Sequence, residues 1–186
     1  FNAVADERDL RETYLPAFES CVKEAKVACI MGAYNRTNGE PCCASPTLLE
    51  KILRDEWGFT GYVVSDCGAI CDIHKNHKVT DTPEESAALA VKNGCELNCG
   101  GIYAALLGAV DQGLITEAEI DVALMRLFSA RFELGMFDPE ESNPYAQIPP
   151  EIVNGPVHRE VARRVAQESM VLLRNEGNLL PLSREL

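Results

Sequence analysis

The sequence predicts an α/β fold built on parallel strands. Three apolar runs of strand length occur at residues 27–34, 62–66 and 95–99, and segments with helical periodicity separate them. Strands that alternate with helices over short links are typical of a parallel sheet with right-handed crossovers. Three strands are too few for a closed barrel, and an open sheet of three leaves both edges exposed. We therefore expect the chain to form part of a larger α/β structure.

The first third of the chain supplies the first predicted strand and two helices. Apolar spacing over residues 9–25 indicates a helix, and Pro16 is expected to bend or restart it. Residues 27–34 form a continuous apolar run, as in a strand that is covered on both faces. Residues 35–42 are expected to form a loop. Ser45 places a hydroxyl cap before a proline, which predicts the start of the next helix.

The second and third strands enclose a long predicted loop and one helix. Residues 62–66, YVVSD, form the second apolar run, and residues 67–81 are expected to be the loop. Thr82 and Glu85 have the spacing of a capping box, which predicts a helix that ends before the third strand at 95–99.

Further helices, a linker and a short apolar segment complete the chain. Helices are predicted at residues 102–112 and 116–134. The segment 137–155 contains four prolines and few core residues, so we expect a linker with a domain boundary near its start. A helix over 158–176 and an apolar stub at 178–182 follow.

Composition and charge restrict the partners. Hydrophobic residues make up 46% of the 186 residues, as in an ordinary globular chain, and the net charge is −12. An acidic balance of this size disfavours binding to nucleic acid or to an anionic membrane surface, because both would repel it. No apolar run is long enough to span a bilayer, and the N-terminal residues lack a signal-peptide pattern. We therefore expect no nucleic-acid partner and no membrane partner.

Eight cysteines are many for a chain of this length. The chain is too long and too apolar to need a disulfide framework, and the cysteine spacing does not match that of zinc ligands. Buried free thiols and one or two disulfides both remain open, whereas a metal site is disfavoured. The cysteines are Cys21, Cys29, Cys42, Cys43, Cys67, Cys71, Cys95 and Cys99.

Polar residues follow each of the three predicted strands, at 34–35, 65–67 and 96–99. The carboxyl ends of parallel strands share one rim, where α/β proteins place their functional residues. Asp66 comes just after the apolar residues at 62–64, so its carboxylate is partly desolvated and held by rigid backbone, which suits a nucleophile or a general base. An aspartate at a strand end also caps the next turn, and position alone leaves both roles open.

The residues around Asp66 resemble a known family. The run GFTGYVVSDCGAI is similar to the nucleophile motif of glycoside hydrolase family 3, in which an aspartate ends the seventh strand of a (β/α)8 barrel. Residues 30–59 resemble the sixth strand and its helix, 113–139 the closing helices, and 158–182 the connection into a second, α/β sandwich domain. The resemblance covers nearly the whole chain.

The resemblance implies a fold and an activity. The fold would be the C-terminal portion of a TIM barrel at 1–138, a linker at 139–157 and the truncated start of the second domain at 158–186. The activity would be retaining hydrolysis of terminal non-reducing β-linked sugars with Asp66 as nucleophile, without cofactor or metal. The expected partners are a glycoside or oligosaccharide substrate, and the N-terminal half-barrel and C-terminal domain of a longer parent chain. Because no acid/base candidate is present here, the fragment alone is expected to be inactive.

Two pairs of residues refine this expectation. Met31 and Tyr34 match a family M-x-x-Y pattern that lines the sugar pocket, so the Tyr34 hydroxyl is expected to bond the nucleophile or the sugar; core packing is the alternative for both. Cys67 stands where many β-glucosidases of the family have tryptophan. Together with Cys99 in L-N-C-G, it resembles the β-xylosidase and α-L-arabinofuranosidase branch, with a disulfide or two nearby thiols at the rim.

Some readings remain open. β-Glucosidase activity is the main alternative, a β-N-acetylhexosaminidase is disfavoured because the chain resembles a two-domain enzyme, and a non-catalytic truncated remnant is the alternative from another class. His74 and His77 invite a metal site, but without a carboxylate at ligand spacing they are expected to be loop surface residues. Glu96 is either a pocket group or a structurally paired acid.

Overall fold

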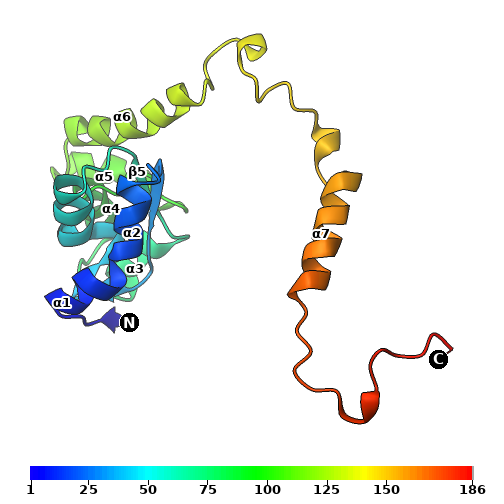
Figure 1. The fold of residues 1–186 in the computed structure, drawn as a ribbon. Helices are drawn as coiled ribbons and strands as arrows, with labels where there is room; N and C mark the ends of the chain where they lie inside the picture. The colour runs from blue at the N-terminus through cyan, green and yellow to red at the C-terminus, as the bar shows by residue number, and fades with distance from the viewer. Residues whose placement is uncertain (186) are drawn as a thin grey trace. The chain divides into compact units, whose positions relative to one another are not determined.

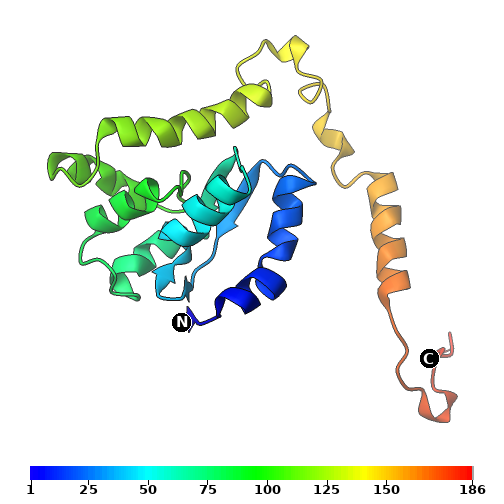
Figure 2. The same ribbon diagram turned by 60° about the vertical axis from the view of Figure 1, so that its left-hand side comes forward.

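The computed structural model describes residues 1–185. The chain divides into two compact units, Phe1–Phe137 and Asp138–Leu186, and each is described by itself. In the first unit, helices gather around short parallel strands (Figures 1 and 2). No helix among the described residues is long and apolar enough to cross a membrane.

Two strands form the centre of the first unit. Strand β2 (Cys29–Gly32) pairs in parallel with β5 (Tyr62–Ser65), with Cys29 opposite Tyr62 and Gly32 opposite Ser65. Both strands were expected from their apolar runs, and the parallel pairing confirms the α/β class. Val63 of β5 is fully buried in the core.

The third predicted strand, at 95–99, is reduced to one bridging residue, so the prediction of a strand of that length is wrong. Leu97 pairs with β5 in parallel, donating to Val63 O at 2.9 Å and accepting from Ser65 N at 2.8 Å. The backbone N–H groups on either side of this bridge donate to side chains and not to backbone carbonyls. The Glu96 carboxylate accepts from Val63 N at 2.7 Å, and the Ser65 hydroxyl accepts from Cys99 N at 3.0 Å.

Residues 35–42 contain a small hairpin, which corrects the prediction of a loop. Strand β3 (Arg36–Thr37) pairs with β4 (Glu40–Pro41) in antiparallel fashion, and β1 (Asn2–Ala3) adds to β3 in parallel. Asn38 and Gly39 both have positive φ, 50° and 90°. This is the geometry of a two-residue type I′ turn, for which Asn-Gly is the favoured sequence.

The helix predicted at 9–25 is divided at Pro16, as expected. Helix α1 (Glu7–Asp9) continues into the π-helical turn η1 (Leu10–Tyr14), and α2 (Pro16–Lys23) starts with the proline at its first position. Proline is tolerated there because the first amide hydrogens of a helix have no helical partner.

The helix predicted to start after Ser45 is present. It is η3 (Pro46–Glu56), in which the Ser45 hydroxyl accepts from Leu48 N at 3.0 Å and Leu49, Ile52 and Leu53 are buried. The element is a π-helix, and at its end Trp57 N donates to Ile52 O, five residues earlier.

The loop predicted at 67–81 contains a helix, α3 (Ala69–Lys75), so that prediction is wrong. The helix is short, and its N-cap is Gly68 at φ 79° without a side-chain hydrogen bond, so it lacks the usual capping signal. Ile70 and Ile73 are fully buried and fix it against the core.

The remaining helices of the first unit follow their predicted caps. Helix α4 (Pro83–Lys92) starts with the Thr82 capping box. A 3₁₀ turn, η4 (Ile102–Ala105), leads into α5 (Leu106–Asp111), and α6 (Glu117–Glu133) starts with the Thr116 capping box.

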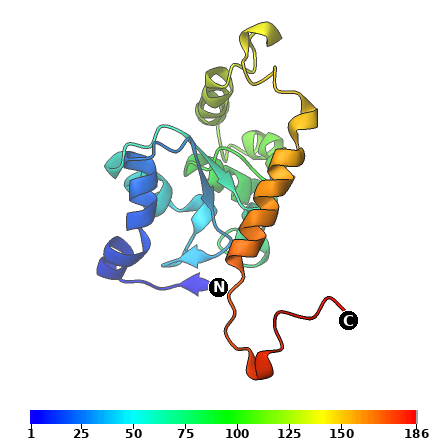
Figure 3. The ribbon, with the colours of Figure 1, turned by 45° about the vertical axis from the view of Figure 1, so that its right-hand side comes forward.

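The second unit contains one long helix and short turns (Figure 3). The turns are η5 (Glu140–Ser142), η6 (Pro150–Ile152) and η7 (Glu176–Asn178), and the helix is α7 (Pro156–Ser169). The prediction that this helix extends to 176 is wrong, because the backbone becomes extended at Met170 with ψ 123°.

Candidate active site

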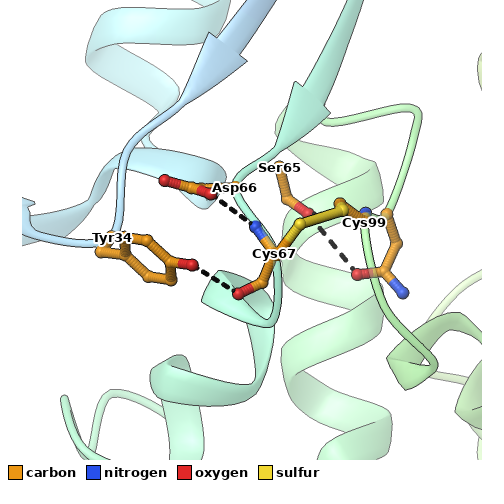
Figure 4. The surroundings of a disulfide bond; sticks show 6 residues. Tyr34, Ser65, Asp66, Cys67 and Cys99 are labelled. Atoms are coloured by element: carbon orange, nitrogen blue, oxygen red, sulfur yellow. Dashed lines mark hydrogen bonds between the residues drawn. A yellow bond between two sulfur atoms is a disulfide. The ribbon is translucent and has the colours of Figure 1, made fainter.

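The end of β5 brings Asp66 next to the end of β2. Asp66 N donates to Gly32 O at 2.9 Å, which continues the parallel ladder by one bond beyond β5. Asp66 is half-buried, and its carboxylate Oδ1 accepts from Cys67 N at 2.7 Å (Figure 4). The side chain makes no capping bond to α3, so the structure does not give Asp66 the helix-capping role.

Tyr34 lies against the same turn. Its hydroxyl donates to Cys67 O at 2.7 Å, so the bond goes to a backbone carbonyl beside Asp66 (Figure 4). Burial by neighbouring atoms and the negative charge of Asp66 raise the pKa of Tyr34. The side chain is 46% exposed, so core packing does not describe it in this chain.

Met31 does not join this group. It is exposed on β2 and lines an apolar cavity of about 530 Å³ between η1, α2, β2 and η3, with Tyr14 and Phe18 among the other lining residues. A pocket with so few polar groups is unlike the polar surroundings that a sugar requires. Substrate binding by Met31 therefore stays a prediction.

A disulfide joins Cys67 and Cys99 at the rim, directly after Asp66 (Figure 4). Their Cα atoms are 4.5 Å apart. Gly68 N donates to Cys99 O at 2.8 Å, so backbone bonds support the same contact. The other six cysteines are free thiols: Cys21, Cys29, Cys42, Cys43, Cys71 and Cys95.

Glu96 is a structurally paired acid. It is only 4% exposed, and its Oε1 atom contacts Arg54 Nη2 at 2.8 Å and Arg126 Nη1. Burial lowers the pKa of Arg54, and the charge of Glu96 opposes this effect. A carboxylate held in this way is not free to donate a proton to a leaving group, so the pocket role considered for Glu96 is not supported.

The two histidines make single hydrogen bonds from the region of α3. His74 Nδ1 lies 3.0 Å from the hydroxyl of buried Ser86, and His77 Nε2 lies 2.9 Å from Tyr34 O. Within residues 1–185, no three His, Cys, Asp or Glu side chains are grouped as a metal site would need. Sequence reasoning treated both histidines as surface residues and missed the contact of His77 with Tyr34, since neither residue type nor spacing signals it.

The chain is similar to known glycoside hydrolases over almost its whole length. Residues 2–130 match the model of the glycosyl hydrolase family 3 N terminal domain. A probable exo-1,4-beta-xylosidase of Neosartorya fischeri is 44% identical over 183 residues, covering 96% of this chain and 24% of that protein. A beta-xylosidase/alpha-L-arabinofuranosidase of Medicago sativa subsp. varia is 43% identical over 98% of this chain and 24% of its own length. The chain thus spans about a quarter of the curated relatives it matches.

Solved structures agree with the sequence comparison. A family 3 exo-beta-xylosidase in complex with a xylobiose aziridine probe matches with a TM-score of 0.87 and 31% identity, over 100% of this chain and 24% of that one. A beta-glucosidase from Listeria innocua matches with a TM-score of 0.79 and 29% identity, over 98% and 25%. These neighbours confirm the expected partial α/β fold of the TIM-barrel type, and the chain belongs to glycoside hydrolase family 3.

Proposed function

We propose that the protein carrying this chain hydrolyses terminal non-reducing β-linked sugars, xylosides in preference, by a retaining double displacement with Asp66 as nucleophile. The observation that carries the proposal is the half-buried carboxylate of Asp66 at the carboxyl end of β5. One backbone amide, Cys67 N, holds Oδ1, and Asp66 makes no ion pair within residues 1–185, so the carboxylate keeps its nucleophilic character.

The reaction needs two carboxyl groups. Asp66 attacks the anomeric carbon and forms a covalent glycosyl-enzyme while a carboxylic acid protonates the departing oxygen; water then breaks the glycosyl-aspartate bond, and the second group accepts its proton. In retaining enzymes the two carboxyl groups lie about 5–5.5 Å apart. Since Glu96 is tied to two arginines, we propose that the acid/base comes from a part of the parent protein outside this chain, and that this chain alone is inactive.

We propose the domain arrangement on similar grounds. Residues 1–138 would belong to the barrel, 139–157 to a linker and 158–186 to the start of the second domain. The division of the chain into compact units after Phe137 supports this assignment.

The preference for pentosides rests on the rim and on the relatives. The Cys67–Cys99 disulfide occupies the position next to the nucleophile, where a tryptophan platform is absent, and so reshapes the pocket towards a smaller sugar. The curated relatives named above are β-xylosidases. β-Glucosidase activity is the second candidate, because solved β-glucosidases match the same fold over 98% of the chain.

The first test compares aryl β-xyloside, β-glucoside and α-L-arabinofuranoside as substrates of the full-length protein. Higher kcat/KM on the pentosides is expected, and a preference for the glucoside would keep the family but reject the specificity. No turnover on any of them would favour a non-catalytic remnant.

The second test concerns the nucleophile. Asp66→Ala should lower kcat by orders of magnitude, and azide should restore turnover with an inverted glycosyl azide as product. Asp111→Ala, which removes an exposed carboxylate on α5, is the matched control and should behave as wild type. Near-normal turnover of Asp66→Ala would reject the assignment.

A further inference from the structure

The ring of His77 reaches from the end of α3 to the backbone of Tyr34. His77 Nε2 lies 2.9 Å from Tyr34 O. A carbonyl oxygen can only accept, so the imidazole donates this bond from Nε2. The His77 side chain is half-buried, although the bond itself lies in an exposed part of this chain.

The turn after α3 holds His77 in place. Asn76 N and His77 N both donate to Asp72 O, at 2.9 and 2.7 Å, and Val79 N donates to Ile73 O at 3.0 Å. Ile73 is fully buried in the core. The backbone of His77 is therefore held by a helix that is anchored to the core.

Three hydrogen bonds connect this histidine to the proposed nucleophile. His77 holds the Tyr34 carbonyl, the Tyr34 hydroxyl donates to Cys67 O, and Cys67 N donates to Asp66 Oδ1. Tyr34 follows the end of β2, and Asp66 follows the end of β5. The three hydrogen bonds therefore connect the ends of the two strands. Tyr34 is fixed at both its backbone and its side chain.

We propose that His77 is a positioning residue, which fixes Tyr34 against the backbone carbonyl of Cys67 and thereby the direction of the Asp66 carboxylate that Cys67 N holds. The inference rests on the proposed function, because it assigns His77 a part in the geometry of that nucleophile. Unlike the loss of a purely structural residue, the loss of the His77 ring should lower kcat more than the free energy of unfolding. A small misplacement of a reacting group is costly because orientation supplies much of the rate enhancement.

The test uses three variants of the full-length protein. His77→Ala removes the bond, and His77→Gln keeps an N–H donor of similar reach. His74→Ala removes the hydrogen bond between Ser86 and the histidine that lies on α3. We expect kcat of His77→Ala to fall about five- to tenfold, which corresponds to the loss of one hydrogen bond, with KM changed less than about twofold. His77→Gln should recover most of kcat, and His74→Ala should lower the melting temperature while leaving kcat unchanged.

Three outcomes would overturn the inference: an unchanged kcat in His77→Ala, an equal loss in His77→Ala and His77→Gln, or an equal loss in His74→Ala. Each would show that His77 is no more than a structural residue.

A second readout does not depend on turnover. Tyrosines are replaced by 3-fluorotyrosine, and the ¹⁹F signal of Tyr34 is assigned by its absence in Tyr34→Phe. His77→Ala should shift or broaden that signal, and His77→Gln should restore it. An unmoved signal overturns the inference even if Asp66→Ala abolishes turnover. If the protein hydrolyses no glycoside, the proposed function fails, and the fluorine signal still shows whether His77 positions Tyr34.

Discussion

Arg54 and Glu96 form a buried ion pair, with Arg54 Nη2 2.8 Å from Glu96 Oε1. Their side chains are 8% and 1% exposed. The same carboxylate contacts Arg126 on α6 and accepts from Val63 N on β5. One side chain therefore joins η3, α6 and β5, the last of which leads directly to Asp66.

Removing the charge of Glu96 should destabilise the fold. Glu96→Gln keeps an oxygen for Val63 N but removes the buried counter-charge of two arginines, and Arg54 retains only the more exposed Glu50 at 3.8 Å. Breaking a buried pair in this way costs about 3–5 kcal/mol. The midpoint of urea unfolding should fall accordingly. Glu117→Gln, an exposed acid in the first turn of α6, is the control and should lose less than about 1 kcal/mol. Equal stability of the two variants would contradict a central role for the pair.

The sequence could not decide the role of Glu96, because its partners are distant along the chain. Arg54 is 42 residues away and Arg126 is 30 residues away. The Glu96 carboxylate accepts from Val63 N, where a backbone carbonyl would continue the strand pairing. The strand predicted at 95–99 is therefore reduced to the single bridge between Val64 and Leu97. Apolar runs identify strands, but they do not show where a side chain, and not a backbone carbonyl, accepts from a backbone N–H group.

Gly61 should not tolerate alanine. A Cβ atom at this position would lie 2.2 Å from the carbonyl oxygen of Ala28 and 2.7 Å from the Phe59 ring, so backbone at the start of the β2–β5 pair would have to move. Overpacking of this kind costs about 1–3 kcal/mol. Gly101→Ala is the matched control, because nothing lies within 4 Å of its Cβ position and φ is −111°. Thermal unfolding of the two variants should separate them, and a similar melting temperature would contradict the predicted clash.

The Cys67–Cys99 disulfide should stabilise the rim. It closes a loop with a sequence separation of 32. Because the crosslink lowers the conformational entropy of the unfolded chain, a loop of that length predicts a stabilisation of about 4 kcal/mol. Dithiothreitol should therefore lower the melting temperature of the wild type but not of the double variant Cys67→Ser/Cys99→Ser. Cys21→Ser, which removes an exposed free thiol, should keep the wild-type response. A wild type that is insensitive to reductant, with its thiols shown to be reduced, would contradict the prediction.

The candidate site could be located from the sequence, but its hydrogen bonds could not. The rule that function lies at the carboxyl ends of parallel strands places Asp66 and Tyr34 on one rim, and the structure brings them together. The choice of Cys67 O as acceptor for Tyr34 depends on side-chain direction, which residue spacing does not encode. The Asn38-Gly39 turn is different, because the Asn-Gly pair in the sequence itself favours a two-residue hairpin turn. The prediction of a loop at 35–42 did not use that signal.

Acid should destabilise the fold through His74. Burial lowers the pKa of His74, and the positive charge of Lys75 lowers it further. The Nδ1 atom of His74 lies 3.0 Å from the hydroxyl of Ser86. The unfolded chain therefore binds the proton more readily than the folded one. The contribution of His74 to stability is complete above the unfolded pKa of about 6.5 and is lost as the pH falls below it.

His74→Asn, which keeps a polar partner for Ser86, removes this titration. Between pH 7.5 and 5 the free energy of unfolding should fall less in His74→Asn than in the wild type, as measured by urea unfolding at each pH. His158→Asn changes an exposed histidine on α7 and should retain the wild-type pH dependence. A His74→Asn profile parallel to the wild type would mean that carboxylates alone carry the acid sensitivity. A flatter profile would show that protonation of His74 carries part of the acid sensitivity.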